Sequence, residues 1–323
     1  MQFSPEELAW ATDVVGRMVP PTPQYVWPLL GHKTGAEVWV KHENHTPTGA
    51  FKVRGGLVYA ERLRRRSPGV KGIVSATRGN HGQSLAFAGR AAGIDVTIVV
   101  PEGNSPDKNS AMRGYGADLI VHGHDFQAAR EHASAIGAAQ GLETVPSYHP
   151  DLVLGVATYA RELFAAAGEL DAVYVPVGMG SGISGVIGIR DLLGLRTEVI
   201  GVVADAAPAT ARSVAAGRVV TTDTAATFID GVACRVPDAD AIAIISAGAS
   251  RILTVSEDDA AEAMRVIFAA THNVAEPAGA LALAGLLSER SGSARKRVAV
   301  ILTGGNVDAD LLLEVLGGHT PTV

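Results

Sequence analysis

Short apolar runs alternate with longer amphipathic stretches along most of the chain. The apolar runs predict strands at 37–41, 72–75, 96–100, 119–121, 172–177 and 298–302. The stretches between them, several of them rich in alanine, predict helices near 80–92, 106–114, 125–140 and 256–270. Strands that alternate with helices in this way are typical of α/β layers.

Two of the expected helices have recognisable start signals. Ser4 and Glu7 have the spacing of a capping box, so the first residues predict an amphipathic helix rather than a signal peptide. Ser256, followed by Glu257, can cap the long helix near 256–270. Between the first helix and the strand at 37–41, the proline-rich segment 20–23 predicts an extended chain.

Composition narrows the class of protein. A chain of 323 residues is long enough for one large or two moderate domains. The net charge is −6, and the basic cluster at 62–66 is expected at the end of a helix, which argues against nucleic-acid binding. Cys234 is the single cysteine, which fits a reducing cytoplasm. No apolar run reaches the roughly 20 residues that span a bilayer, so a soluble, cytoplasmic protein is expected.

The segment KHENHTPTGAFKVRGG, residues 41–56, contains the first candidate for chemistry. Lys52 follows a turn-rich run and Phe51, and it opens a helical pattern. An aromatic side chain beside a lysine at such a junction can hold a flat ring against a nucleophilic amine, which suggests a Schiff base with an aldehyde cofactor. The alternative is a solvated lysine at the start of a helix.

Three glycine-containing turns each follow a predicted strand. They are SATRGNHGQS at 75–84, VPVGMGSGISG at 175–185 and LTGGNVD at 302–308. The first two lead into helices, whose free backbone N–H groups favour an anion. In the second, glycines at alternating positions let backbone amides converge on a phosphate. The third ends its strand with the hydroxyl of Thr303.

The lysine motif followed by these turns resembles the fold type II pyridoxal-phosphate enzymes, specifically the serine/threonine dehydratase and serine racemase family. The resemblance covers about Pro20 to Asp308. It implies an α/β fold of two open, twisted-sheet domains, similar to tryptophan synthase β, with the cofactor in the cleft between them. Residues 72–147 would be a small domain inserted into a large domain of residues 1–71 and 148–323. A homodimer is also expected.

The resemblance implies pyridoxal 5′-phosphate as the cofactor and assigns roles around it. Lys52 would form the Schiff base, and its amine would then act as the base at the substrate Cα. Phe51 would pack near the cofactor ring, Asn80 would bond its phenolic oxygen, and Thr303 would face the pyridine nitrogen. A neutral hydroxyl there makes a weaker electron sink, which suits β-elimination better than transamination. The remaining implied cofactor-binding residues are Gly178, Met179, Gly180, Ser181 and Gly182 of the phosphate loop, and Glu276 at the wall of the site.

The turn at 77–81 is the expected binding place for the substrate carboxylate. Backbone N–H groups of this turn, which contains Gly79 and His81, and the hydroxyl of Thr77 can donate to it. Arg78 stands where related dehydratases and racemases commonly have serine or alanine. Because that serine supplies the acid/base on the second face in racemases, Arg78 argues against efficient racemisation. Its guanidinium could bind a second carboxylate, clamp the α-carboxylate, or be solvated.

Other positions also depart from the family pattern. Ala50 replaces a serine two residues before the lysine, and the segment 155–158 replaces the usual GQGT. Asp205 falls where racemase-like relatives have an acidic metal ligand, but Ala211 occupies the second acidic position, so no metal is expected.

These features predict a lyase that eliminates water from a β-hydroxy-α-amino acid and gives a 2-oxo acid and ammonia. Threonine, serine, 3-hydroxyaspartate, phenylserine and a ring-derived hydroxy amino acid all remain open as substrates. With the sequence ending at Val323, no C-terminal regulatory domain is expected, and this expectation favours a catabolic role. The alternatives are a β-replacement transferase, against which GNH argues, an amino-acid racemase, and a non-catalytic amino-acid-binding protein, against which the intact Lys52 argues.

Overall fold

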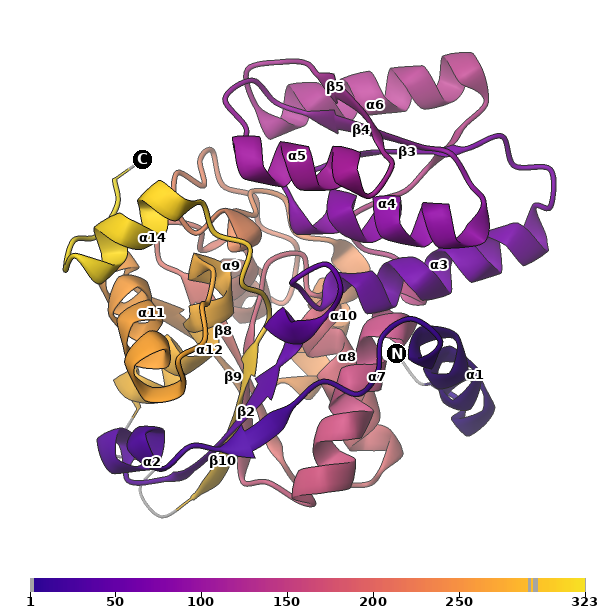
Figure 1. Ribbon diagram of the computed structural model, residues 1–323. Helices are drawn as coiled ribbons and strands as arrows, with labels where there is room; N and C mark the ends of the chain where they lie inside the picture. Colours follow the sequence, from indigo (N-terminus) through magenta and orange to yellow (C-terminus); the bar gives the residue numbers. More distant parts are fainter. Residues whose placement is uncertain (1–2, 290–291, 293–295, 323) are drawn as a thin grey trace.

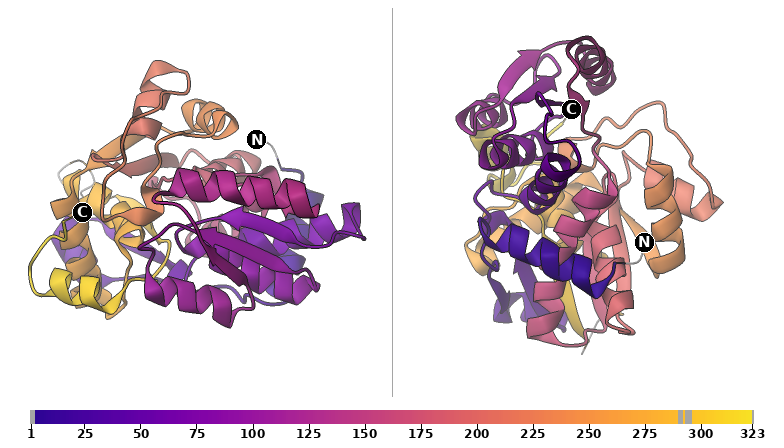
Figure 2. Two further views of the ribbon diagram at one scale, coloured as in Figure 1. Left: turned by 90° about the horizontal axis from the view of Figure 1, so that it is seen from above. Right: turned by 90° about the vertical axis from the view of Figure 1, so that its right-hand side faces the viewer.

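Two separate sheets form the framework of the molecule. The computed structural model describes residues 3–289, 292 and 296–322 (Figure 1). One sheet has six strands in the order β1-β2-β10-β7-β8-β9, and the other has four in the order β5-β4-β3-β6. In Figure 1 the four-stranded sheet and its helices lie together at the upper right, and Figure 2 shows the same arrangement from above and from the side.

The four-stranded sheet is entirely parallel and has helices on both faces. Val74 and Val99 pack with α6 on one face, whereas Ile73 and Ile98 belong to the main core on the side of α4 and α5. This alternation is the period of two that a β-strand imposes on its side chains. The elements are β3 (Ile73–Ala76), α4 (Asn80–Ala92), β4 (Val96–Val100), α5 (Pro106–Gly114), β5 (Asp118–Val121), α6 (Phe126–Gln140) and β6 (Glu143–Thr144).

The six-stranded sheet is parallel except for β1, which pairs antiparallel with β2 at one edge. Both faces of its centre are buried, since Val173 and Val175 enter one core and Ala172 and Tyr174 enter the other. The strands are β1 (Gln24–Val26), β2 (Glu37–His42), β7 (Ala172–Pro176), β8 (Glu198–Ala204), β9 (Arg251–Val255) and β10 (Arg297–Leu302).

Helices cover the six-stranded sheet on both sides. The side chains of one group join the core that holds Val173: α1 (Pro5–Gly16), α7 (Pro150–Ala167), α8 (Ser181–Leu192), α9 (Ala209–Ala216) and α10 (Ala239–Gly248). Those of the other group join the core that holds Tyr174: α2 (Pro28–Thr34), α11 (Glu257–Thr271), α12 (Pro277–Ser288) and α14 (Ala309–Leu316). Two short 3₁₀ turns, η1 (Glu43–His45) and η2 (Asp230–Val232), lie in loops. Within the described residues, no helix is long and apolar enough to cross a membrane.

Helix α3 (Lys52–Arg66) lies between the two sheets and packs on α4 and α7. Two adjacent glycines of α3 allow its backbone to approach both of these helices closely. A Cβ at Gly55 would lie 2.7 Å from the carbonyl oxygen of Leu152 on α7, and one at Gly56 would clash with Ser84 on α4. The start of α3 is therefore fixed from two sides, which positions its first residue, Lys52.

The α/β fold and the predicted elements are confirmed. Every strand and helix that the sequence predicts by range is present, with its ends within one residue of the prediction. The capping boxes of α1 and α11 are formed by Ser4 with Glu7 and by Ser256 with Asp259. Among the elements that the sequence reading missed are the strands β1, β6, β8 and β9.

Candidate active site

The carboxyl ends of neighbouring parallel strands bring the candidate loops together. In the six-stranded sheet β10 lies between β2 and β7. The loop that leads to Lys52 follows β2, Thr303 follows β10, and Gly178 lies in the loop after β7. Open α/β sheets bind ligands beyond the carboxyl ends of their strands. The strand order thus accounts for residues far apart in sequence meeting at one edge.

Backbone hydrogen bonds join the loop before Lys52 to the loop after β10. The amide of Phe51 donates to the carbonyl of Thr303 at 2.9 Å, and the amide of Gly305 donates to the carbonyl of Gly49 at 2.9 Å. Gly49 has φ 67°, a left-handed conformation that favours glycine. Thr303 is buried and directly adjoins the turn that presents Lys52.

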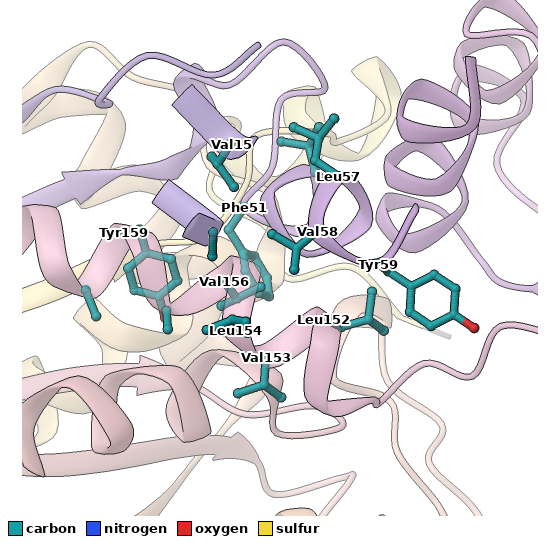
Figure 3. Close-up of a cluster of buried hydrophobic side chains, with 14 of the residues drawn as sticks. Val15, Phe51, Leu57, Val58, Tyr59, Leu152, Val153, Leu154, Val156 and Tyr159 are labelled. Carbon is teal, nitrogen blue, oxygen red and sulfur yellow. The ribbon is translucent and has the colours of Figure 1, made fainter. Parts of the chain in front are cut away.

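Phe51 connects the lysine to the glycine-rich loop. Figure 3 shows its ring among side chains of α3 and α7, and it meets the ring of Tyr159 edge-on at a centroid distance of 6.2 Å. The Nζ of Lys52 lies 4.8 Å from the centroid of the Phe51 ring. A Cβ at Gly182 would lie 3.8 Å from the same ring. The amine and the start of α8 therefore flank one aromatic side chain.

Lys52 has an unusual electrostatic environment. Burial lowers the pKa of its amine to about 8, and the carboxyl of Glu276 partly opposes that shift. Its Nζ has no hydrogen-bond partner among the residues that the structure describes. A lysine held in this way supplies far more neutral, nucleophilic amine near neutral pH than an ordinary lysine does.

The loop at 178–182 has the conformation of an anion cradle. Gly180 has φ 97° and precedes α8, which begins at Ser181 with no side-chain cap. By contrast, α1 and α11 are capped by serine hydroxyls. A Cβ at Gly178 would lie 2.7 Å from the carbonyl oxygen of Gly231, so only glycine fits there. The free N–H groups of α8 remain available to an anion. Met179 points to Cys234, with their sulfur atoms 3.4 Å apart.

Asn80 is held between two loops of the six-stranded sheet. Its Nδ2 donates to Oε1 of Glu276 at 2.7 Å, and its Oδ1 accepts from Nδ2 of Asn306 at 2.8 Å. Burial raises the pKa of Glu276 to about 7, and Lys108 partly opposes that shift. The Oε2 of Glu276 has no partner in the described residues. The predicted hydrogen bond from Asn80 to a cofactor oxygen stays a prediction.

The turn at 77–81 joins β3 to α4. Oγ1 of Thr77 accepts from the amide of Gly79 at 3.0 Å, and Gly79 precedes α4 without a side-chain cap. His81 is buried, and its Nε2 has no partner in the described part of the chain. Burial, with a further contribution from Lys52, lowers the pKa of His81 to about 3, so its ring is neutral. Arg78 is exposed.

The sequence reading missed two groups of charged residues beside the site. Lys108 of α5 is buried and forms an ion pair with Asp230 of η2. Behind Lys52, the side chain of Arg54 is fully buried and pairs with Glu43 at 2.7 Å and with Glu162 at 2.7 Å. The arginine in the motif FKVRGG was visible in the sequence, but nothing there marked its partners.

The lowered pKa of Lys52 can be tested without any cofactor. In the cofactor-free protein, acylation of Lys52 followed by mass spectrometry should show a midpoint near pH 8. Glu276→Gln removes a carboxylate that favours the ammonium form, so the midpoint should fall further. Glu102→Gln, at an exposed carboxylate, should leave it unchanged. A midpoint near the ordinary lysine value of about 10.4 would contradict this description of the site.

Comparisons with known proteins show which family the chain belongs to. The family model described as pyridoxal-phosphate dependent enzyme matches residues 16–304. The L-threo-3-hydroxyaspartate ammonia-lyase of Saccharomyces cerevisiae is 31% identical, over 97% of this chain and 97% of its own length. A protein of the same name from Pseudomonas sp is 34% identical, over 92% and 93%. The structure of the processed form of threonine deaminase isoform 2 from Solanum lycopersicum is 26% identical, with a TM-score of 0.89 over 98% of this chain and 94% of that one.

Proposed function

Because the chain belongs to the family of pyridoxal-phosphate dependent enzymes, we propose that it is an ammonia-lyase acting on a β-hydroxy-α-amino acid. The proton at Cα and the hydroxyl at Cβ would leave as water. The resulting enamine would then hydrolyse to a 2-oxo acid and ammonia. The observation that carries the proposal is a lysine amine of lowered pKa beside an uncapped, glycine-rich helix start. The names of the two relatives favour 3-hydroxyaspartate as the substrate, ahead of serine, threonine and phenylserine.

The described residues fit pyridoxal phosphate. The Nζ of Lys52 is free of hydrogen bonds within the described chain, and the start of α8 offers unsatisfied N–H groups to a phosphate. Thr303, buried at the end of β10, offers a hydroxyl rather than a carboxylate to a ring nitrogen. When bound, this cofactor withdraws electrons from the substrate Cα and so makes its proton acidic.

Lys52 is proposed to remove the proton at the substrate Cα. Its amine can accept that proton because burial disfavours the ammonium form. Glu276 has a pKa of about 7, raised by burial, so it can exchange a proton in the pH range in which Lys52 titrates. Phe51 restricts the position of the amine, since it packs beneath Nζ at 4.8 Å from its ring centroid.

The α-carboxylate of the substrate is proposed to bind at the start of α4. The N–H groups there have no side-chain cap, and Thr77 orients the turn by accepting from the amide of Gly79. His81 is neutral and partner-free in the described residues, so it can donate to or accept from a bound substrate without adding charge.

The domain division, the oligomeric state and the location in the cell are also proposals. Residues 72–147 would form a small domain and the rest a large one, supported by the fact that the whole four-stranded sheet falls within 72–147. A homodimer is supported by exposed apolar side chains on β1 and on the helix that follows it, among them Tyr25 and Leu29. A cytoplasmic location is supported by the single, unpaired cysteine.

Release of 2-oxo acid across a panel of β-hydroxy amino acids tests the proposed function. The panel should contain both configurations of 3-hydroxyaspartate, serine, threonine and phenylserine. We expect turnover of at least one β-hydroxy amino acid, with the highest kcat/KM for 3-hydroxyaspartate. Absence of 2-oxo acid from every member, in protein loaded with cofactor, would reject the proposed function.

Arg78 gives a prediction about specificity. If its exposed guanidinium reaches the second carboxylate of 3-hydroxyaspartate, Arg78→Ala should lower kcat/KM for that substrate about ten- to a hundredfold. Serine and threonine, which lack that carboxylate, should lose little. Equal losses for all substrates would instead place the guanidinium on the α-carboxylate. A loss below about threefold for each would show that Arg78 is solvated.

A further inference from the structure

Lys108 is a buried cation that the proposed reaction does not use. Its stem lies on the turn proposed to bind the α-carboxylate, because a Cβ at Gly79 would lie 2.7 Å from Cδ of Lys108. Its ammonium forms an ion pair with the carboxylate of Asp230, in η2. Only 9% of the Lys108 side chain is exposed, so most of the pair is shielded from solvent. One lysine therefore connects the two sheets across the site.

Asp230 lies in a segment that supports the opposite side of the site. The next residue, Gly231, presents its carbonyl oxygen 2.7 Å from where a Cβ at Gly178 would lie. A Cβ at Gly231 would in turn lie 2.7 Å from Cβ of Ala278, in the first turn of α12. The segment η2 is thus packed between the glycine-rich loop and the helix that begins after Glu276.

The charges around Lys108 hold it as a cation. Burial alone would lower its pKa, but Asp230 and then Glu276 outweigh that effect, and the pKa of Lys108 is raised. The amine is therefore not a candidate base. Because the ammonium is already paired with the carboxylate of Asp230, a further carboxylate on the substrate would gain little from it.

Neighbours of Lys108 make further contacts between the same two parts of the molecule. Oγ of Ser105 donates to Oδ1 of Asp308 at 2.5 Å, and the hydroxyl of Tyr115 donates to the carbonyl of Pro47 at 2.6 Å. Both residues flank α5, which belongs to the four-stranded sheet (Figure 1). The helix is therefore docked on loops of the six-stranded sheet at both of its ends.

We propose that the Lys108–Asp230 ion pair is a bridge across the active site, and that Lys108 is a positioning residue. The bridge holds the proposed carboxylate-binding turn at Gly79 at a fixed distance from the glycine-rich loop at Gly178. The reacting substrate and Lys52 then keep a fixed geometry. Because the pair joins the two sheets, its loss would free the turn at Gly79 from the loop at Gly178. This inference rests on the function proposed above.

A double-mutant cycle tests the bridge. The variants are Lys108→Met, Asp230→Asn and the two combined, with Arg113→Met as the control that removes an exposed cation from the same helix. Each single variant should lower kcat/KM about ten- to a hundredfold for 3-hydroxyaspartate and serine alike. The double variant should lose no more than about threefold beyond the worse single variant, since both changes open one bridge. Arg113→Met should keep wild-type activity.

Hydrogen exchange in the cofactor-free protein provides a readout that a general loss of stability would not reproduce. Breaking the bridge should speed exchange about tenfold or more at 77–80 and 230–232, in each single variant, while the strands of both sheets keep their rates. Unchanged exchange in those segments, or equal acceleration everywhere, would overturn the bridge. So would a loss of kcat/KM confined to 3-hydroxyaspartate, which would make Lys108 a reader of the second carboxylate. If the wild type releases no 2-oxo acid but the exchange pattern holds, the proposed function fails and the bridge stands.

Discussion

Replacement of Lys52 by alanine is expected to abolish elimination. The change removes the amine of lowered pKa that is proposed to bind the cofactor and to take the proton from the substrate Cα. Loss of general-base catalysis alone costs about 10²- to 10⁴-fold in rate, and loss of the covalent attachment adds to it. The measurement is the rate of 2-oxo acid release from 3-hydroxyaspartate and serine by protein saturated with cofactor.

The matched control for that experiment is Lys71→Ala, at an exposed lysine between α3 and β3. It should leave both turnover and cofactor absorbance unchanged. The Lys52→Ala variant should also fail to retain cofactor through dialysis. Near wild-type turnover of Lys52→Ala without added amine would remove Lys52 from the mechanism.

Among the variants proposed, Arg54→Met is expected to lower the free energy of unfolding the most. Arg54 and Glu43 are both fully buried, and Glu162 and Lys41 complete the same cluster. Removing the arginine leaves the carboxylate of Glu43 in the interior without its cation. Breaking one partner of a buried ion pair costs about 3–5 kcal/mol. The measurement is the free energy of unfolding in urea, compared between the wild type and the variant.

Arg64→Met is the control, because Arg64 lies on the same helix and its own side chain, paired with Glu61, is largely exposed. Its loss should stay below about 1 kcal/mol. The cluster also bears on the site, since Glu43 lies at the start of the loop that ends at Lys52. Arg54→Met should therefore weaken cofactor binding at temperatures where the variant is still folded. An Arg54→Met loss as small as that of Arg64→Met would show that the cluster does not stabilise the fold.

The sequence predicted the site residues best where the signal lies within a few neighbouring positions. Lys52, the glycine-rich loop and Thr303 each lie within a short motif after an apolar run, and those runs are the strands β2, β7 and β10. Parallel strands present their carboxyl ends at one edge, which is consistent with the meeting of these motifs that the family resemblance implied. That β10 lies between β2 and β7 came from the structure. The strand β8 has a similar apolar run, Glu198–Ala204, and could have been predicted from the same signal.

The parts that could not be predicted depend on contacts between distant residues. Lys108 and Asp230 are separated by 122 positions, and Asn80 and Glu276 by 196. Neither pair has a spacing that a sequence pattern could reveal. The strand β1 has only three residues and follows a proline-rich segment, and its pairing with β2 is what makes it a strand.

The stoichiometry of the products formed from 3-hydroxyaspartate tests the proposed elimination most directly. Wild-type protein loaded with pyridoxal phosphate is incubated with one configuration of the substrate, and ammonia, 2-oxo acid and the configuration of the remaining substrate are measured together. We predict one ammonia and one 2-oxo acid for each substrate lost, while the remaining substrate keeps its configuration. Inversion at Cα without ammonia, or loss of substrate with neither product, would contradict the proposed elimination.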